Sequence, residues 1–175
     1  MIKISITGHR DLKKDQILNY KQQLKDYILS IIEKNNLEIK IITPLADGVD
    51  RLISYVAIEL GLEFEILLPM PREMYIQDFD MSFLEEFISL ESKASSIEIM
   101  PLYFDNTVES ISKYGVDRDY QYSEVGRTFA QKSDYMIALW DNIDNNKWGG
   151  TAHVIKMRRE FYNKDIFIVE VERIL

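Results

Sequence analysis

Short apolar runs alternate with amphipathic segments along the chain, and this alternation constrains the fold more than any other feature. The runs with the length and β-branched content of strands are residues 2–7, 38–43, 63–68, 96–101, 134–140 and 166–171. Apolar residues recur at helical spacing in 15–34, 47–60, 74–94 (with a break near 79–82), 119–132 and 150–162. Residues 103–117 are expected to form a loop with a short helix. The pattern predicts an α/β fold, a doubly wound and mainly parallel sheet of about six strands with helices on both faces.

The composition excludes several classes of function. The 175 residues favour a single domain, 1–175, and the net charge of −8 argues against a general nucleic-acid binder. The chain has no cysteine, so it forms no disulfide. It has no apolar run of membrane-spanning length and no signal pattern at its N-terminus, so we expect no membrane contact and a soluble cytoplasmic protein.

Four segments that follow apolar runs carry glycine, basic or hydroxyl residues. They are Thr7-Gly8-His9-Arg10, residues 44–51 (Pro-Leu-Ala-Asp-Gly-Val-Asp-Arg), Pro69-Met70-Pro71-Arg72 and Trp148-Gly149-Gly150-Thr151. In an open α/β sheet the carboxyl ends of the strands lie along one edge, where ligands bind. The four segments together therefore indicate a site for a phosphate-bearing small molecule.

Two of these segments precede a predicted helix. Asp47 is expected to cap the helix that follows it. Arg51 falls in the first turn, where its charge opposes the helix dipole, so it is either a ligand residue or the partner of Asp47 or Asp50 in an ion pair. Gly149-Gly150-Thr151 has the composition of a phosphate cradle built from backbone N–H groups, or of a flexible loop that ends in a helix cap.

The remaining side chains near the strand ends suggest further contacts. Tyr120, Tyr122, Trp140 and Trp148 are candidates for stacking on a base, and Arg127 for contact with a phosphate; the alternative is that such tyrosines are simply half-buried. Arg72 is either a ligand residue or an exposed arginine in a turn. The histidines, His9 and His153, form no close pair in the sequence, so no metal or other cofactor is expected. The carboxylates best placed to act as a base are Asp47, Asp50, Glu73 and Asp141.

The order and spacing of these segments resemble the SLOG superfamily, a Rossmann-like group that includes the LOG nucleotide phosphoribohydrolases and the fold of DNA-processing protein A. The similarity is closest to stand-alone members that begin with Gly-His-Arg. The residues that carry it are Gly8-His9-Arg10, 45–51, 68–73, Val125-Gly126-Arg127, 137–141 and Gly149-Gly150-Thr151-Ala152. They cover nearly the whole chain.

The resemblance implies a nucleotide-derived ligand, such as a cyclic nucleotide or an ADP-ribose-type signal. It implies a sensor with a separate effector protein, or a protein that sequesters the signal, in prokaryotic or phage defence, and it implies a homo-oligomer. The implied ligand-binding residues are Gly8, His9, Arg10, Ala46, Asp47, Gly48, Arg51, Pro69, Arg72, Tyr122, Arg127, Trp140, Gly149, Gly150, Thr151 and His153. On this hypothesis Arg51→Ala abolishes binding.

Two alternatives stay open. One is a LOG-like hydrolase of the nucleotide N-glycosidic bond, with Asp47, Asp50 or Glu73 as the catalytic carboxylate. LOG enzymes carry Pro-Gly-Gly-x-Gly-Thr-x-x-Glu, but this chain has Val154 at the glutamate position, which favours a binding protein over an enzyme. The other alternative is a protein-interaction module with a vestigial pocket.

Overall fold

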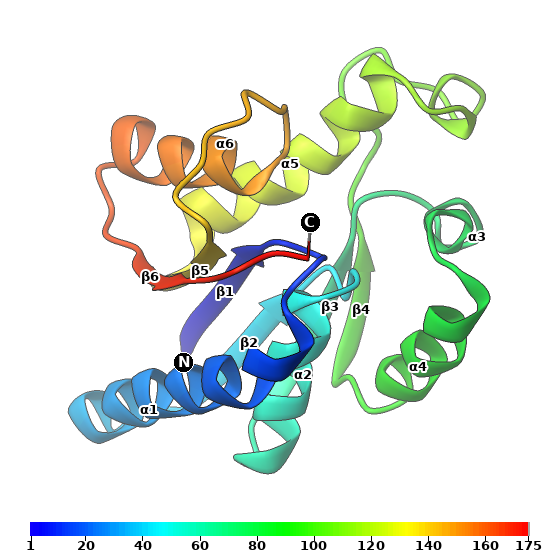
Figure 1. Cartoon of the computed structure of the whole chain (residues 1–175). Coiled ribbons are helices and arrows are strands. Elements are labelled where there is room, and N and C mark those ends of the chain that lie inside the picture. The colour runs from blue at the N-terminus through cyan, green and yellow to red at the C-terminus, as the bar shows by residue number, and fades with distance from the viewer. Residues whose placement is uncertain (175) are drawn as a thin grey trace.

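The computed structural model describes residues 1–174, and within that range it contains one sheet of six parallel strands (Figure 1). The strand order is β4-β3-β2-β1-β5-β6. The bounds are Ile2–Gly8 (β1), Ile39–Thr43 (β2), Glu63–Leu68 (β3), Ser96–Ile99 (β4), Tyr135–Trp140 (β5) and Phe167–Glu170 (β6). The predicted α/β fold is confirmed, and the sheet is entirely parallel.

Helices cover the two faces of this sheet, as Figure 1 shows. The helices α1 (Ile17–Asn35), α2 (Val49–Glu59) and α4 (Met81–Glu91) lie on one side, while α5 (Val116–Lys132) and α6 (Thr151–Lys156) lie on the other. Strand β5, which lies between β1 and β6, is buried on both faces along residues 136–139, which is why its sequence is continuously apolar. The edge strand β4 is mostly exposed.

The shorter elements depart from the predicted ranges. The chain has 3₁₀ turns at η1 (Lys14–Gln16), η2 (Ile76–Asp78) and η3 (Ser110–Ser112), and a short helix α3 (Arg72–Tyr75). The predicted helix 74–94 is divided because Asp80 caps α4, its Oδ1 accepting the Phe83 N–H at 2.8 Å. The predicted helix 150–162 changes after Lys156 into a π-helical turn, η4 (Met157–Phe161).

The predicted cap at Asp47 is wrong. The N-cap residue of α2 is Gly48, whose φ of 78° lies in the left-handed region. The Asp47 side chain accepts the N–H of the next residue, Gly48, at 2.6 Å and pairs with Arg51 in the first turn of α2. It therefore does not act as the N-cap of that helix.

The chain changes direction between β1 and β5. From β1 it builds outward through β2 and β3 to β4, and then returns to place β5 on the other side of β1, where Gly8 lies opposite Leu139. This reversal opens a crevice beyond the carboxyl ends of β1 and β5. The chain passes beside the crevice again after β6 (Figure 1), where Arg173 lines it and forms an antiparallel bridge with Leu12. Among residues 1–174, no helix combines the length and apolar character that crossing a membrane requires.

Candidate functional site

A cavity of about 500 Å³ lies at this reversal point. All four strand-end segments contribute to its wall, together with α3, η2 and the start of α5. The predicted ligand-binding residues that line it are Gly8, His9, Arg10, Ala46, Pro69, Tyr122, Gly149, Gly150 and Thr151. Residues from all four segments therefore lie around one cavity.

Two glycines allow the first two segments to touch. A Cβ on Gly8 would lie 2.5 Å from Val49 Cγ2, and a Cβ on Gly48 would lie 2.6 Å from the His9 carbonyl oxygen and from Arg10 Cα. Side chains at either position would force the end of β1 away from the start of α2. The cavity wall at His9 and Arg10 therefore depends on both glycines.

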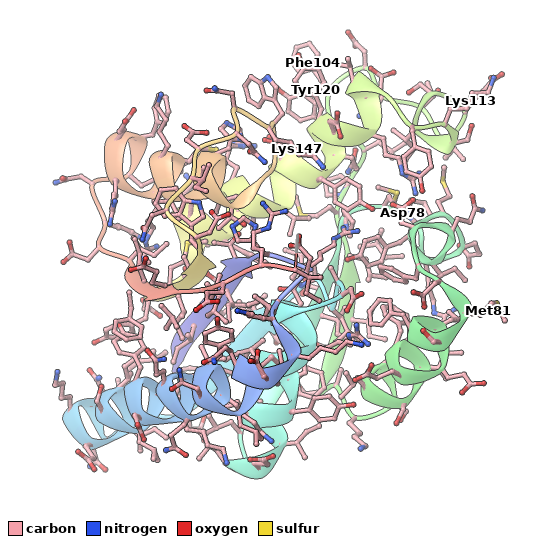
Figure 2. All side chains as sticks on the ribbon, in the orientation of Figure 1. Asp78, Met81, Phe104, Lys113, Tyr120 and Lys147 are labelled. Carbon is pink, nitrogen blue, oxygen red and sulfur yellow. The ribbon has the colours of Figure 1, made fainter. Side chains whose placement is uncertain are left out.

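Two cations on the cavity wall form no ion pair with any carboxylate of residues 1–174. Arg10 is exposed, and its guanidinium carbon lies 6.0 Å from the centre of the Tyr122 ring. Lys147 reaches the cavity from the loop before α6, whereas Asp78 reaches it from η2 (Figure 2). Trp148 stands next to Lys147 on the rim, 57% exposed, and its ring packs edge-on against Tyr120 and His153. These groups suit an anion that is joined to a flat ring.

Asp50 also lines the cavity, from the first turn of α2. Burial raises the pKa of its carboxyl group from 3.8 to about 7, although nearby Arg10 and hydrogen bonds from the Ala46 amide and the Thr43 hydroxyl favour the charged form. A carboxyl group that titrates near neutral pH can give or accept a proton in the cavity.

A buried ion pair supports the cavity wall next to Tyr122. Arg118 is 3% exposed, donates to Asp78 at 2.8 Å and also donates to the carbonyl oxygens of Ile111 and Met74. The Tyr122 hydroxyl donates to the same Asp78 carboxylate. The sequence analysis missed Asp78 and Arg118. Arg51 was chosen because an arginine in the first turn of a helix opposes the helix dipole. Arg118 lies in the first turn of α5, so the same pattern could have identified it.

His9 is held at the carboxyl end of β5. Its Nε2 lies 2.9 Å from Asp141 Oδ1, and Arg173 lies 3.4 Å from the other oxygen of that carboxylate. Arg173 also contacts both carboxylate oxygens of Asp11, at 2.8 to 3.0 Å. Asp141 therefore positions His9 and is not free to act as a base.

Three arginines predicted to bind ligand do not line the cavity. Arg51 pairs with Asp47 and Glu86 and lies 3.9 Å from the centre of the Phe83 ring, so the ion-pair alternative describes it correctly. Arg72 makes two hydrogen bonds to Glu91, at 2.6 and 2.7 Å, and Arg127 pairs with Glu124. Their carboxylate partners lie in the loop before α2 (Asp47), on α4 (Glu86 and Glu91) and on α5 (Glu124), so these arginines are held in ion pairs outside the cavity lining.

Four other predicted ligand-binding residues also lie outside the lining: Asp47, Gly48, Trp140 and His153. Glu73, a proposed catalytic carboxylate, is exposed and lies outside it as well. Gly48 affects the cavity indirectly, because it lets the start of α2 pack against His9 and Arg10. Trp140 turns its indole N–H to the Ile143 carbonyl at 3.1 Å.

The double glycine differs from the predicted cradle. The Gly149 N–H donates to His153 Nδ1 at 3.0 Å, and the Gly150 N–H donates to the Lys147 carbonyl at 3.1 Å. Both amides are thus used within the loop, with Gly149 at a φ of 68°. The loop lines the cavity with residues 147–150, and Thr151 lines it from the first turn of α6. No group of three histidine, aspartate or glutamate side chains in the described part of the chain is arranged to hold a metal ion.

No family model matches the chain, and no curated protein does. Two solved structures resemble it along almost its full length. The X-ray structure of DNA processing protein A from Streptococcus pneumoniae has a TM-score of 0.62 at 12% identity over 96% of this chain. DNA processing protein A from Helicobacter pylori, described for its single-stranded DNA binding, has a TM-score of 0.56 at 16% identity over 95%.

The chain spans 50% and 64% of these two proteins. At such low identity the likeness concerns the fold alone. It agrees with the Rossmann-like α/β architecture that the SLOG resemblance implied.

Proposed function

We propose that this chain is a single, SLOG-like domain that binds a nucleotide-derived small molecule in the cavity at the carboxyl edge of the sheet. One observation carries the proposal: the cavity at the β1/β5 reversal presents two cations, Arg10 and Lys147, that form no ion pair within residues 1–174, and the exposed ring of Trp148 lies at its rim. Reversal points are where open α/β sheets bind ligands.

The dimensions and chemistry of the cavity support this class of ligand. Its volume of about 500 Å³ falls in the range of about 300–1,000 Å³ that is usual for small-molecule sites. Arg10 and Lys147 both line the cavity and can each donate a charge-assisted hydrogen bond to a phosphate group. A base fits against Trp148, since stacking on an aromatic ring tolerates any base.

The biological use that we propose follows the SLOG resemblance. An ADP-ribose-type or other nucleotide signal of prokaryotic defence is either sensed, with a separate effector reading the bound state, or sequestered from another receptor. We further propose a homo-oligomer in the cytoplasm. The open cavity argues against a vestigial pocket filled by its own side chains, and so against a module that only binds other proteins.

Isothermal titration with AMP, ADP, ADP-ribose and cyclic nucleotides tests the proposal. We expect micromolar binding of at least one of them, weakened at least tenfold by Arg10→Ala because a charge-assisted contact is lost. Arg159→Ala is the matched control: Arg159 is exposed on η4, away from the cavity lining, and its removal changes the net charge equally. Absence of binding to every member, or equal effects of the two variants, would refute the proposal.

A hydrolase is the second candidate, and Asp50 is the observation that favours it. The oxocarbenium-like charge of N-glycosidic cleavage needs a carboxylate nearby, and a carboxyl group with a pKa of about 7 in the cavity is suited to proton transfer. Chromatography for base released from nucleotides is the test. Release that Asp50→Asn abolishes and Asp47→Asn preserves would establish the hydrolase, because Asp47 faces Arg51 outside the cavity lining.

Binding of single-stranded DNA, described for one of the structural neighbours, is not part of the proposal, since the net charge of −8 opposes a polyanion. Fluorescence anisotropy with a labelled oligothymidylate at low salt checks this. We expect no saturable binding.

A further inference from the structure

The inner wall of the cavity contains a hydroxyl group without a partner. Tyr75 lines the cavity, its side chain is 0% exposed, and its hydroxyl forms no hydrogen bond within residues 1–174. The hydroxyl of neighbouring Tyr122, in contrast, donates to Asp78. A buried polar group without a partner destabilises a fold, so its retention points to a partner that enters the cavity.

Packing fixes the ring of Tyr75 in this position. The ring meets Phe79 edge-on, with centroids 4.8 Å apart, and lies 6.3 Å from Phe87 and 6.0 Å from Tyr122. Since aromatic rings surround it, Tyr75 cannot turn its hydroxyl toward solvent. The direction of the hydroxyl is therefore set before any ligand arrives.

A second oxygen-bearing group belongs to the same wall. Asp50 lines the cavity from α2, and its carboxyl group is near enough to Tyr75 and Arg10 for their charges to interact. The Thr43 hydroxyl and the Ala46 amide approach Asp50 from within the protein. A carboxylate has about four acceptor positions, so these two donors leave some for a ligand.

We propose that Tyr75 and Asp50 together bind the vicinal diol of a ribose. One sugar hydroxyl donates to an Asp50 carboxylate oxygen, and the other accepts the proton of the Tyr75 hydroxyl. This inference rests on the proposed function and narrows its ligand class: the preferred ligands carry free 2′- and 3′-hydroxyl groups, as AMP and ADP-ribose do. Nucleotides whose phosphate closes on the 3′-oxygen, and deoxynucleotides, lack this diol.

The test compares AMP, 2′-deoxy-AMP and 2′,3′-dideoxy-AMP by isothermal titration against the wild-type protein and Tyr75→Phe. We expect wild type to bind AMP at least tenfold more tightly than dideoxy-AMP, because the site's polar groups stay unpaired with the analogue. Tyr75→Phe should weaken AMP about three- to tenfold and leave dideoxy-AMP unchanged. Tyr103→Phe is the control, since Tyr103 is half-buried but lies outside the cavity lining.

The outcomes separate the two proposals. Binding of all three nucleotides with equal affinity would overturn the diol site and leave the nucleotide-binding function standing. An equal effect of Tyr75→Phe on AMP and dideoxy-AMP would also overturn it. Failure of AMP, and of every other nucleotide in the panel that tests the proposed function, to bind would overturn both proposals. If Tyr75→Phe did not fold, the wild-type comparison of AMP with dideoxy-AMP would still decide the question.

Discussion

Asp50 faces the cavity from the first turn of α2, and burial raises the pKa of its carboxyl group from 3.8 to about 7. The folded protein therefore holds this proton more tightly than the unfolded chain does. Stability from the protonated group is present at low pH and is lost as the pH rises toward 7. Each pH unit between the two pKa values changes the free energy of unfolding by about 1.4 kcal/mol, so full ionisation costs at most about 4 kcal/mol.

Asp50→Asn removes this cost, because asparagine stays neutral at every pH. The gain in stability over wild type should grow by about 1–2 kcal/mol between about pH 5.5 and pH 7, and should level off above about pH 8. The lower figure allows for water in the cavity, which screens the charge. Urea unfolding at a series of pH values, followed by far-UV circular dichroism, measures the difference.

Asp26→Asn is the matched control. Asp26 is exposed on α1, so its substitution changes the net charge equally without touching the cavity. The effect of burying the carboxyl group is read as the difference in unfolding free energy between Asp50→Asn and this variant at each pH. If that difference did not change with pH, the assignment of a raised pKa to Asp50 would be wrong.

Three further substitutions test other parts of the structure. Gly48→Ala should cost about 2 kcal/mol or more in thermal unfolding, because of its positive φ and the contact with the β1 end, whereas Gly115→Ala, with open space around it, should cost little. Arg118→Ala should cost about 3–5 kcal/mol, since it leaves Asp78 charged and buried, and unchanged urea midpoints would contradict the ion pair. Arg51→Ala should keep its nucleotide affinity in titrations and lose about 1 kcal/mol of stability; lost binding would restore Arg51 to the ligand site.

Most of the fold follows from local sequence signals. Apolar runs that end at Pro44 and Pro69 define two strands, because proline cannot continue the sheet ladder, and the predicted strand 63–68 matches β3 at both ends. The end of the last helix was not predictable in this way. Arg158 is 1% exposed there and donates to the carbonyls of Ala130, Ser133, Asp134 and Asp165, contacts that bring distant residues together.

The candidate site follows from the sequence only in part. Strand ends of a parallel sheet converge by topology, so Gly8, Arg10 and Thr151 were predicted to share an edge and do line one cavity. The roles of the arginines depend on carboxylates elsewhere in the chain, such as Glu86 for Arg51, and no local pattern shows those. Tyr75 was missed for a similar reason, since its hydroxyl stands out only through having no hydrogen-bond partner among residues 1–174.

The two tryptophans offer the most direct test of the central claim that a nucleotide occupies this cavity. Trp148 lies on the cavity rim, while Trp140 is outside the lining and donates its indole N–H to Ile143. Their indole signals in a ¹H–¹⁵N correlation spectrum, assigned with Trp148→Phe, can be followed while AMP is added. We predict a saturable shift of the Trp148 signal that is several times larger than that of Trp140. A Trp148 signal that stays in place at millimolar AMP, and at millimolar concentrations of every other nucleotide in the titration panel, would contradict the account.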